Sequence, residues 1–197
     1  FIRAVARSYT VAGLHRALRN GDCPARRSAA LALTYLGGGE SIAAVGQALR
    51  DPDRAVRFIV ENGIGAVWSR AGSMDQQHRL QRMARWNRCG QFTQAIDLGC
   101  AILEENPGFG EVWYQRAFAQ FSVGDFEASV ADSQQALETN SYQFHAAVGL
   151  GQSYLELEAV SNAIRSFQWA LRIHPHLEFA RAQIRRLERE QRERLDR

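Results

Sequence analysis

Two closely similar phrases, GQFTQAI at 90–96 and GDFEASV at 124–130, recur in the chain at an offset of 34. Each begins with glycine, has phenylalanine two positions later, and ends in a small residue followed by a β-branched aliphatic one. A fixed period of this length is typical of repeat architectures, in which stacked helix pairs share one continuous core. The spacing therefore predicts a helical solenoid.

At this period the chain divides into three units, 76–109, 110–143 and 144–177. Each unit begins with an apolar pattern of helical period, turns near its middle, and continues into a second helix. Pro107 and Pro175 close the first and third units, and Ser141 takes that place in the second. Proline suits this position because it cannot continue a helix.

These units resemble the tetratricopeptide repeat (TPR), a pair of antiparallel helices. The resemblance rests on Trp86, Gly90, Phe92, Ala95, Ile96, Leu103 and Pro107; on Trp113, Ala117, Gly124, Phe126, Ala136 and Leu137; and on Leu150, Gly151, Tyr154, Ala163, Phe167, Ala170 and Pro175. Gly99 and Ser133 stand where the family usually has an aromatic residue, and Arg116 where it often has leucine. We expect these departures to affect local packing and not the fold.

The first part of the chain, 1–68, repeats at a different period. TVAGLHRALRNGD at 10–22 aligns with SIAAVGQALRDPD at 41–53, an offset of 31. Thr10 and Ser41 fit helix N-caps, because their hydroxyls can accept from free backbone N–H groups. Asp22 and Asp53 fit the caps of a second helix in each repeat.

This part, 1–68, resembles a pair of short HEAT-type repeats, as in bacterial HEAT-like families. The family's habit of an acid in the turn and an arginine on the second helix is matched by Asp22/Arg26 and Asp53/Arg57. The resemblance implies a ladder of such pairs between neighbouring repeats; alternatively, each is a solvated cap beside a surface arginine. Gly63 and Gly65 weaken the last helix by roughly 1 kcal/mol each unless close packing needs them.

The resemblances together imply an all-α fold, a right-handed α–α superhelix (α-solenoid) of HEAT-like and then TPR helix pairs. Residues 69–75 are expected to form a junction, and 178–197 a C-terminal capping helix in which Phe179, Ile184 and Leu187 cover the last repeat. The end of this helix is either stabilised by the ion pairs Glu188/Arg192 and Glu190/Arg194 or frayed. Ile2 and Val5 match Leu33 and Leu36 at the same offset of 31, so the chain is expected to be part of a longer array.

Charge and composition exclude several classes of function. The formal net charge is +3, and the chain has no lysine; arginine exceeds the acids by four in 1–75, while acids exceed arginine by three in 76–177. This is not the strong basic bias of a nucleic-acid-binding domain. The three cysteines, Cys23, Cys89 and Cys100, make no disulfide framework and are expected to be reduced packing residues, which favours a cytoplasmic location.

No pattern of catalytic or cofactor-binding residues is apparent. His174 and His176 lie one residue apart in a turn where further metal ligands are lacking, so exposed rings and no metal site are expected. LGGGE at 36–40 follows a helix and is better explained as a helix end than as a phosphate loop. We therefore expect no cofactor and no enzymatic activity.

A partner is expected on the concave face, which the TPR resemblance assigns to the first helix of each unit. The candidate partner-binding residues are Gln77, Gln81, Ala84, Asn87 and Arg88; Glu111, Tyr114, Gln115, Phe118 and Phe121; and His145, Val148, Gln152, Leu155 and Glu156. Tyr114 and Phe118 share a helix face and are expected in the groove, whereas Phe121 fits groove or core equally. Lys, Asn and Arg that hold a terminal carboxylate in chaperone-tail TPR proteins are replaced here by Ala84, Leu80 and Gly149.

The sequence thus predicts a scaffold or adaptor that binds a protein or peptide segment in its TPR groove, with no membrane span. Two alternatives remain open. One is an accessory module of a larger enzyme. The other is a nucleic-acid-binding repeat protein that uses the arginines of the HEAT-like part: Arg16, Arg19, Arg26, Arg27, Arg50, Arg54 and Arg57.

Overall fold

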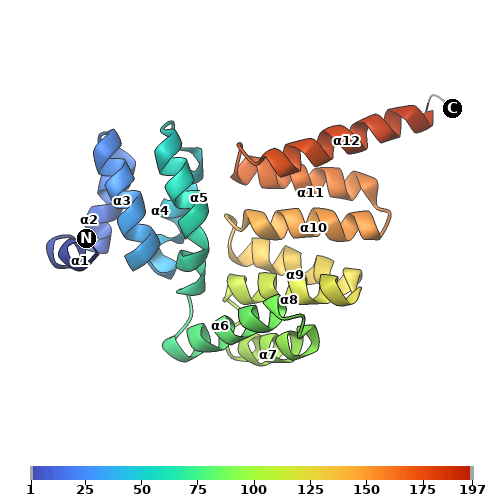
Figure 1. Ribbon diagram of the computed structural model, residues 1–197, viewed down its shortest axis with the longest axis horizontal. Helices are drawn as coiled ribbons and strands as arrows, with labels where there is room; N and C mark the ends of the chain where they lie inside the picture. Colours follow the sequence, from blue (N-terminus) through green and yellow to red (C-terminus); the bar gives the residue numbers. More distant parts are fainter. Residues whose placement is uncertain (1, 196–197) are drawn as a thin grey trace. The chain divides into compact units, whose positions relative to one another are not determined.

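The computed structural model describes residues 2–195, and the side chains of residues 2–193. All regular structure in this part of the chain is helical (Figure 1), which confirms the all-α class. The residues divide into two compact units, 1–78 and 79–197. The continuous superhelix expected to run through both units remains a prediction.

The first unit is built from short helices around a small aliphatic core. Its core includes Leu14, Leu18, Leu33, Leu49 and Val60, all nearly inaccessible to solvent. Helix α3 packs against both α2 and α5. The helices are α1 (Ile2–Ser8), α2 (Val11–Asn20), α3 (Cys23–Leu36), α4 (Ile42–Gln47), α5 (Arg54–Ser69) and the start of α6 (Met74–Arg88), with single 3₁₀ turns at Gly39–Ser41 and Ala48–Arg50.

Three of the four predicted N-caps in this unit are confirmed. The side chains of Thr10, Asp22 and Asp53 accept hydrogen bonds from backbone N–H groups in the first turns of α2, α3 and α5. The prediction for Ser41 is wrong, because the preceding glycines lead into a 3₁₀ turn that gives Ser41 helical backbone angles. Its buried hydroxyl instead lies 2.9 Å from His15 Nε2.

A ladder of ion pairs joins the two repeats of the first unit. The Arg26 guanidinium donates to both carboxylate oxygens of Asp51, at 2.9 and 3.2 Å. Arg27 pairs in the same way with Asp53, at 2.7 Å, and this holds the pKa of Asp53 below its usual range. Asp53 is therefore both a cap and a member of the ladder, whereas Asp22 only caps α3. The predicted pairs Asp22/Arg26 and Asp53/Arg57 are wrong, because Arg26 reaches Asp51 and Arg27 takes Asp53. Arg57 donates instead to the main-chain carbonyls of its own loop.

Close contact between α3 and α5 explains one of the two glycines in α5. A Cβ atom at Gly63 would lie 2.4 Å from Thr34 Cγ2, whereas one at Gly65 would meet nothing within 4 Å. Gly63 is thus needed for packing. Arg70, in the predicted junction, closes the end of α3 by donating to the carbonyls of Thr34 and Gly37, both at 2.7 Å.

The second unit stacks helices in chain order, each packed against the next (Figure 1). The first helices of consecutive repeats, α8 and α10, also contact each other directly. Each of the three repeat units of the sequence holds one helix pair. The pairs are α6 with α7 (Phe92–Glu105), α8 (Gly110–Val123) with α9 (Phe126–Thr139), and α10 (Phe144–Glu156) with α11 (Val160–Ile173), followed by α12 (Glu178–Leu195).

The phrase repeated in the sequence forms the turn inside the first two helix pairs. Gly90 and Gly124 have φ of 73° and 88°, the left-handed conformation that glycine adopts without steric cost. The third pair has Glu158 at the same place, and its φ is 56°. This turn is less favourable than the other two, because a side chain in this conformation costs energy.

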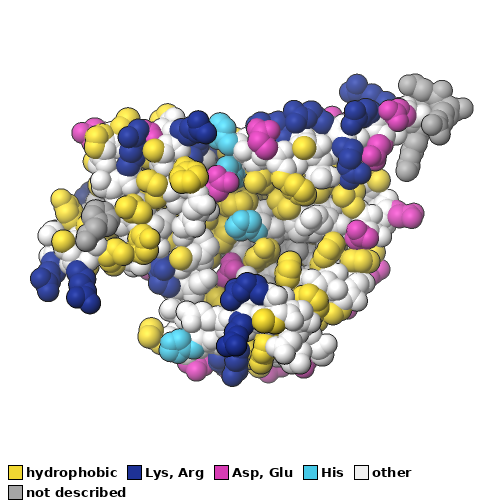
Figure 2. Space-filling view, in the orientation of Figure 1, with side chains coloured by type: hydrophobic (Ala, Val, Ile, Leu, Met, Phe, Trp, Pro, Cys, Tyr) yellow, Lys and Arg dark blue, Asp and Glu magenta, His cyan; other side chains and the backbone are white. Residues whose placement is uncertain are grey.

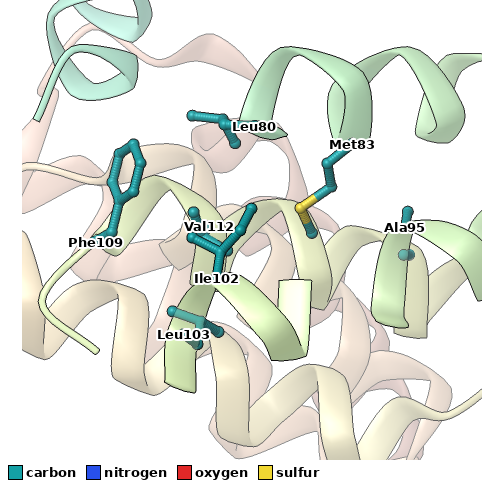
Figure 3. Packing of buried hydrophobic residues seen from close by; sticks show 8 residues of the cluster. Leu80, Met83, Ala95, Ile102, Leu103, Phe109 and Val112 are labelled. Carbon is teal, nitrogen blue, oxygen red and sulfur yellow. The ribbon is translucent and has the colours of Figure 1, made fainter. Parts of the chain in front are cut away.

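The core of the second unit begins where α6, α7 and α8 meet. Leu80 and Met83 of α6 point toward Ile102 of α7 and Val112 of α8 (Figure 3), and all four are almost fully buried. Phe109, just before α8, closes one side of this cluster. The apolar face predicted from the helical period is therefore the one that packs.

The departures from the TPR pattern at Gly99 and Arg116 compensate each other. A Cβ atom at Gly99 would lie 3.1 Å from Arg116 Cδ, so the missing side chain leaves room for the arginine. Arg116 donates to both oxygens of Asp132, at 2.6 and 2.8 Å, and its guanidinium lies 4.8 Å from the centre of the Trp113 ring. A buried ion pair thus fills space that the family gives to apolar side chains.

Helix α12 packs against α11 of the last repeat. Leu187 and Ala180 are buried, and Ile184 is half-buried. Phe179 packs edge-on against Phe167 but keeps 45% of its surface exposed. Glu190 pairs with Arg186 at 3.2 Å, and its expected partner Arg194 lies outside the described side chains.

Candidate functional site

The candidate partner-binding residues lie along α6, α8 and α10 at different depths. We call this surface, together with the adjoining side of α12, the groove face. Asn87 and Glu111 are buried; Gln77, Ala84, Tyr114, Gln115, Phe121, Val148 and Leu155 are half-buried; Gln81, Arg88, Phe118, His145, Gln152 and Glu156 are exposed. Gln77 belongs to the first unit and donates to the Gly72 carbonyl at the start of α6.

A chain of hydrogen bonds connects α6, α8 and the start of α10. Asn87 Nδ2 donates to the main-chain and side-chain oxygens of Gln115, at 2.9 and 3.0 Å. Gln115 Nε2 donates to one oxygen of Glu111 at 3.0 Å, and Gln143 Nε2 donates to the other at 2.7 Å. Burial raises the pKa of Glu111 to about 7, against the opposing effect of these two amides. Gln143 stands in the connection before α10, and no pattern in the sequence marked it.

Tyr114 and His145 form an aromatic pair beside this network. Their ring centres lie 5.8 Å apart with 29° between the planes. Burial, with the nearby Glu111 carboxylate, raises the pKa of Tyr114 to about 12. The His145 ring keeps an exposed edge, but protein around its other sides, followed by the effect of His174, lowers its pKa. The imidazole is therefore neutral at physiological pH.

Phe118 and Phe121 occupy two different environments. Phe118 is 44% exposed and touches Phe92 edge-on, with ring centres 6.4 Å apart. Phe121 is half-buried against Phe126 at 5.4 Å, and its free side lines a pocket. Phe121 therefore packs against Phe126 and also lines the pocket, and its place in a partner-binding groove stays a prediction.

This pocket has a volume of about 160 Å³ and extends the groove face onto α12. Its walls include four predicted candidates, Phe121, Gln152, Leu155 and Glu156, together with Phe167, Phe179 and Gln183. The sequence reading treated Phe179 as part of a cap. The signal that could have placed it here was the period itself, since Phe179 stands one full repeat after His145.

Charge is unevenly distributed over the second unit. Figure 2 shows basic side chains gathered over α12 and α6, with hydrophobic, acidic and histidine side chains in the band between them. On α8 and α10 the charged residues are Glu111, Arg116 and Glu156, and the arginine is committed to Asp132. The middle of the groove face is therefore acidic and aromatic.

Several expectations about reactive residues need correction. His174 is 1% exposed, with its ring edge-on to Phe144 at 5.1 Å, so it is not the exposed loop ring expected; His176 is exposed. Cys23 and Cys89 are also exposed and not packing residues, because each lies at a helix end. Among the residues that the structure describes, no three His, Cys, Asp or Glu side chains gather closely enough to hold a metal ion.

The arginines of the first unit are only partly available to a ligand. Arg26, Arg27 and Arg57 are engaged by Asp51, Asp53 and loop carbonyls. Arg16, Arg19, Arg50 and Arg54 are exposed. In the described residues no helix is long and apolar enough to span a membrane.

Comparison with known proteins identifies the fold. No protein-family model and no curated protein sequence matches the chain. Among solved structures, the first TPR domain of Spaghetti (RPAP3) bound to the HSP90 peptide SRMEEVD is similar, with a TM-score of 0.55 and 19% identity over 57% of this chain and 89% of that one. The first TPR domain of human RPAP3, solved by NMR, gives 0.56 and 18%, over 60% and 93%. The chain therefore contains a TPR-like helical repeat fold, while the HEAT resemblance of its first part remains a prediction.

Proposed function

We propose that the second unit is a protein-interaction module that binds a peptide or protein segment on its groove face, making the protein a scaffold or adaptor. The observation that carries this proposal is the pocket of about 160 Å³ next to exposed aromatic residues. Phe118 and Phe179 are both exposed, and Phe179 lines the pocket. Exposed aromatic side chains around a concave site are the usual anchors of peptide recognition.

The solved neighbour supports a peptide as the partner, since that protein is seen with a bound peptide. The groove face of this chain differs from a carboxylate-binding groove, however. Buried Leu80, half-buried Ala84 and Gly149 stand at positions where the resemblance would require polar or basic side chains. The proposed partner is therefore not an acidic chain end, and its contacts are an apolar anchor plus backbone bonds to the groove amides.

No catalytic role is part of this proposal, and it needs no cofactor. The alternative of nucleic-acid binding by the first unit gains no support from the geometry, because the ion-pair ladder uses Arg26 and Arg27 internally. A cytoplasmic location also stays a prediction.

Substitution of the aromatic residues of the groove face tests the proposal. Peptides selected from a displayed random library on the wild-type protein should lose at least about tenfold in affinity on Phe118→Ala and on Tyr114→Ala. The matched control is Phe58→Ala, which removes another exposed phenylalanine, 67% accessible, from the first unit. Peptides that bind both groove variants normally, or that lose affinity for Phe58→Ala instead, would remove the groove face from the proposal.

A further inference from the structure

The orientation of every amide in the Glu111 network is fixed by its neighbours. The Gln115 main-chain carbonyl can only accept, so Asn87 must turn its NH₂ group toward it. Gln115 then directs its oxygen at Asn87 and its NH₂ at Glu111. Gln143 likewise turns its NH₂ toward the carboxylate. All three amides therefore donate their N–H groups to acceptors within the network.

This arrangement leaves a surplus of acceptors. Asn87 Oδ1 and Gln143 Oε1 are buried and receive no hydrogen bond from any described residue. Gln143 is fully buried and Asn87 is 6% exposed. Since the free oxygen of Gln143 belongs to the amide that touches Glu111, it stands beside the carboxylate. Unsatisfied buried acceptors of this kind cost roughly 1–3 kcal/mol each, so they indicate a missing donor.

The network also contains a buried carboxyl group whose contacts in the described structure are amides and not a cation. Glu111 accepts from Gln115 and Gln143, and the positive end of the α8 dipole at its first turn offsets only part of the charge. Arg116, on the same helix, is turned to Asp132. The helix dipole explains an acid at this position, but it does not explain the two free oxygens.

Aromatic surfaces border the same place. Tyr114 stands one helical turn after Glu111, and its pKa responds to that carboxylate. Its ring stacks on the neutral His145, and Phe118 lies one further turn along α8 with an exposed ring. Aromatic rings next to a carboxylate attract Lys and Arg side chains through their faces.

We propose that this site receives a basic side chain, lysine or arginine, from the segment bound on the groove face. The cation supplies the donor that Gln143 Oε1 lacks, balances the carboxylate of Glu111 and packs on Tyr114, while Asn87 holds Gln115 at the other end of the network. The inference rests on the proposed function. It specifies a positively charged group on the ligand, whereas an acidic chain end is negative.

Peptide selection followed by a double-mutant cycle tests this inference. A random dodecapeptide library displayed on phage is selected on the wild-type protein, on Glu111→Gln and on the control Glu104→Gln, an exposed acid of α7. Wild type and control are expected to enrich one position in Lys or Arg, and Glu111→Gln is not. In the best peptide, Lys→Gln or Arg→Gln should cost wild type about tenfold or more in Kd, and Glu111→Gln less than about threefold.

A second variant keeps the test valid if Glu111→Gln does not fold by circular dichroism. Gln143→Met removes one free oxygen while keeping a side chain of similar length, and it should weaken the same peptides. Selected peptides without a basic position, or an equal loss from Lys→Gln on wild type and variant, would overturn the inference and leave the proposed function standing. If wild type selects no peptide at all, the inference and the proposed function fall together.

Discussion

The two units hold neighbouring helix pairs together with opposite chemistry. In the first unit the bond is a ladder near the surface, in which each arginine is matched to an aspartate of the next repeat. In the second unit the contact is a buried chain of hydrogen-bonded amides that ends on the Glu111 carboxylate. Two amide oxygens in this chain accept no hydrogen bond from the described residues. Each arginine of the ladder already has a carboxylate partner within the unit. The amide network has capacity for one more group, and this difference points to the second unit as the one that binds.

Loss of one partner from the buried ion pair of the second unit is expected to have the largest effect. Asp132→Ala leaves the Arg116 guanidinium without its carboxylate, where its side chain is 14% exposed, and should lower the free energy of unfolding by about 3 kcal/mol. Urea unfolding followed by circular dichroism measures it. Replacing both residues, Arg116→Met with Asp132→Leu, should cost much less; an equal loss would show that the pair is not what stabilises this contact.

The buried carboxylate predicts a pH-dependent stability that the ladder does not share. The pKa of Glu111 is raised in the folded protein from its ordinary 4.5 to about 7. Its contribution is therefore fully present below pH 4.5 and is lost as pH rises toward 7, a fall of up to about 3 kcal/mol. Urea unfolding of wild type and Glu111→Gln between pH 5 and about 8 should show this difference.

His145 gives the opposite slope in the same pH range. Its folded pKa is lowered, so its contribution is present above the ordinary histidine pKa and is lost on acidification. In Glu111→Gln the His145 slope should remain, and stability should rise with pH. Parallel profiles for wild type and Glu111→Gln would contradict the assignment of the slope to Glu111.

A smaller effect is expected at the third turn of the second unit. Glu158 takes the left-handed conformation that glycine provides in the other two turns, so Glu158→Gly should stabilise the fold by about 1 kcal/mol. The matched change Gly124→Ala should destabilise it, because its φ is 88°. Thermal unfolding measures both. A stabilising Gly124→Ala would show that the turn does not need this conformation.

The smallest effect is expected at the outer rung of the ladder. The Arg27 side chain is 51% exposed, so Arg27→Gln should lower Tm only slightly and the loss should shrink further in high salt. Arg26→Gln should cost more, because the Arg26 side chain is only 16% exposed. If the two losses were equal and independent of salt, the ladder would not be an electrostatic contact.

The sequence predicted the elements that depend on period and local capping. The regular spacing of the repeated phrase indicated the helix pairs of the second unit, and the caps at Thr10, Asp22 and Asp53 needed only the first turn of each helix. The prediction at Ser41 was wrong because its backbone is set by the preceding glycines and its hydroxyl by His15, far away in the chain.

The candidate site was harder to predict, since it depends on which polar groups end up buried together. The register of the repeats predicts Glu111 and Asn87 at the surface. Only the packing of three helices shows that both side chains are buried. Gln143 follows no periodic pattern, so its bond to Glu111 could not be foreseen. Phe179 could have been, because it continues the period of the repeats onto α12.

Hydrogen exchange with a library-selected peptide tests the central claim, that the groove face of the second unit binds, most directly. Amide exchange of the full chain is measured by mass spectrometry with and without saturating peptide. Slower exchange is expected in α8 and α10 and at the start of α12, with the first unit unchanged. Protection confined to α2–α5, or to the second helices α9 and α11, would contradict it.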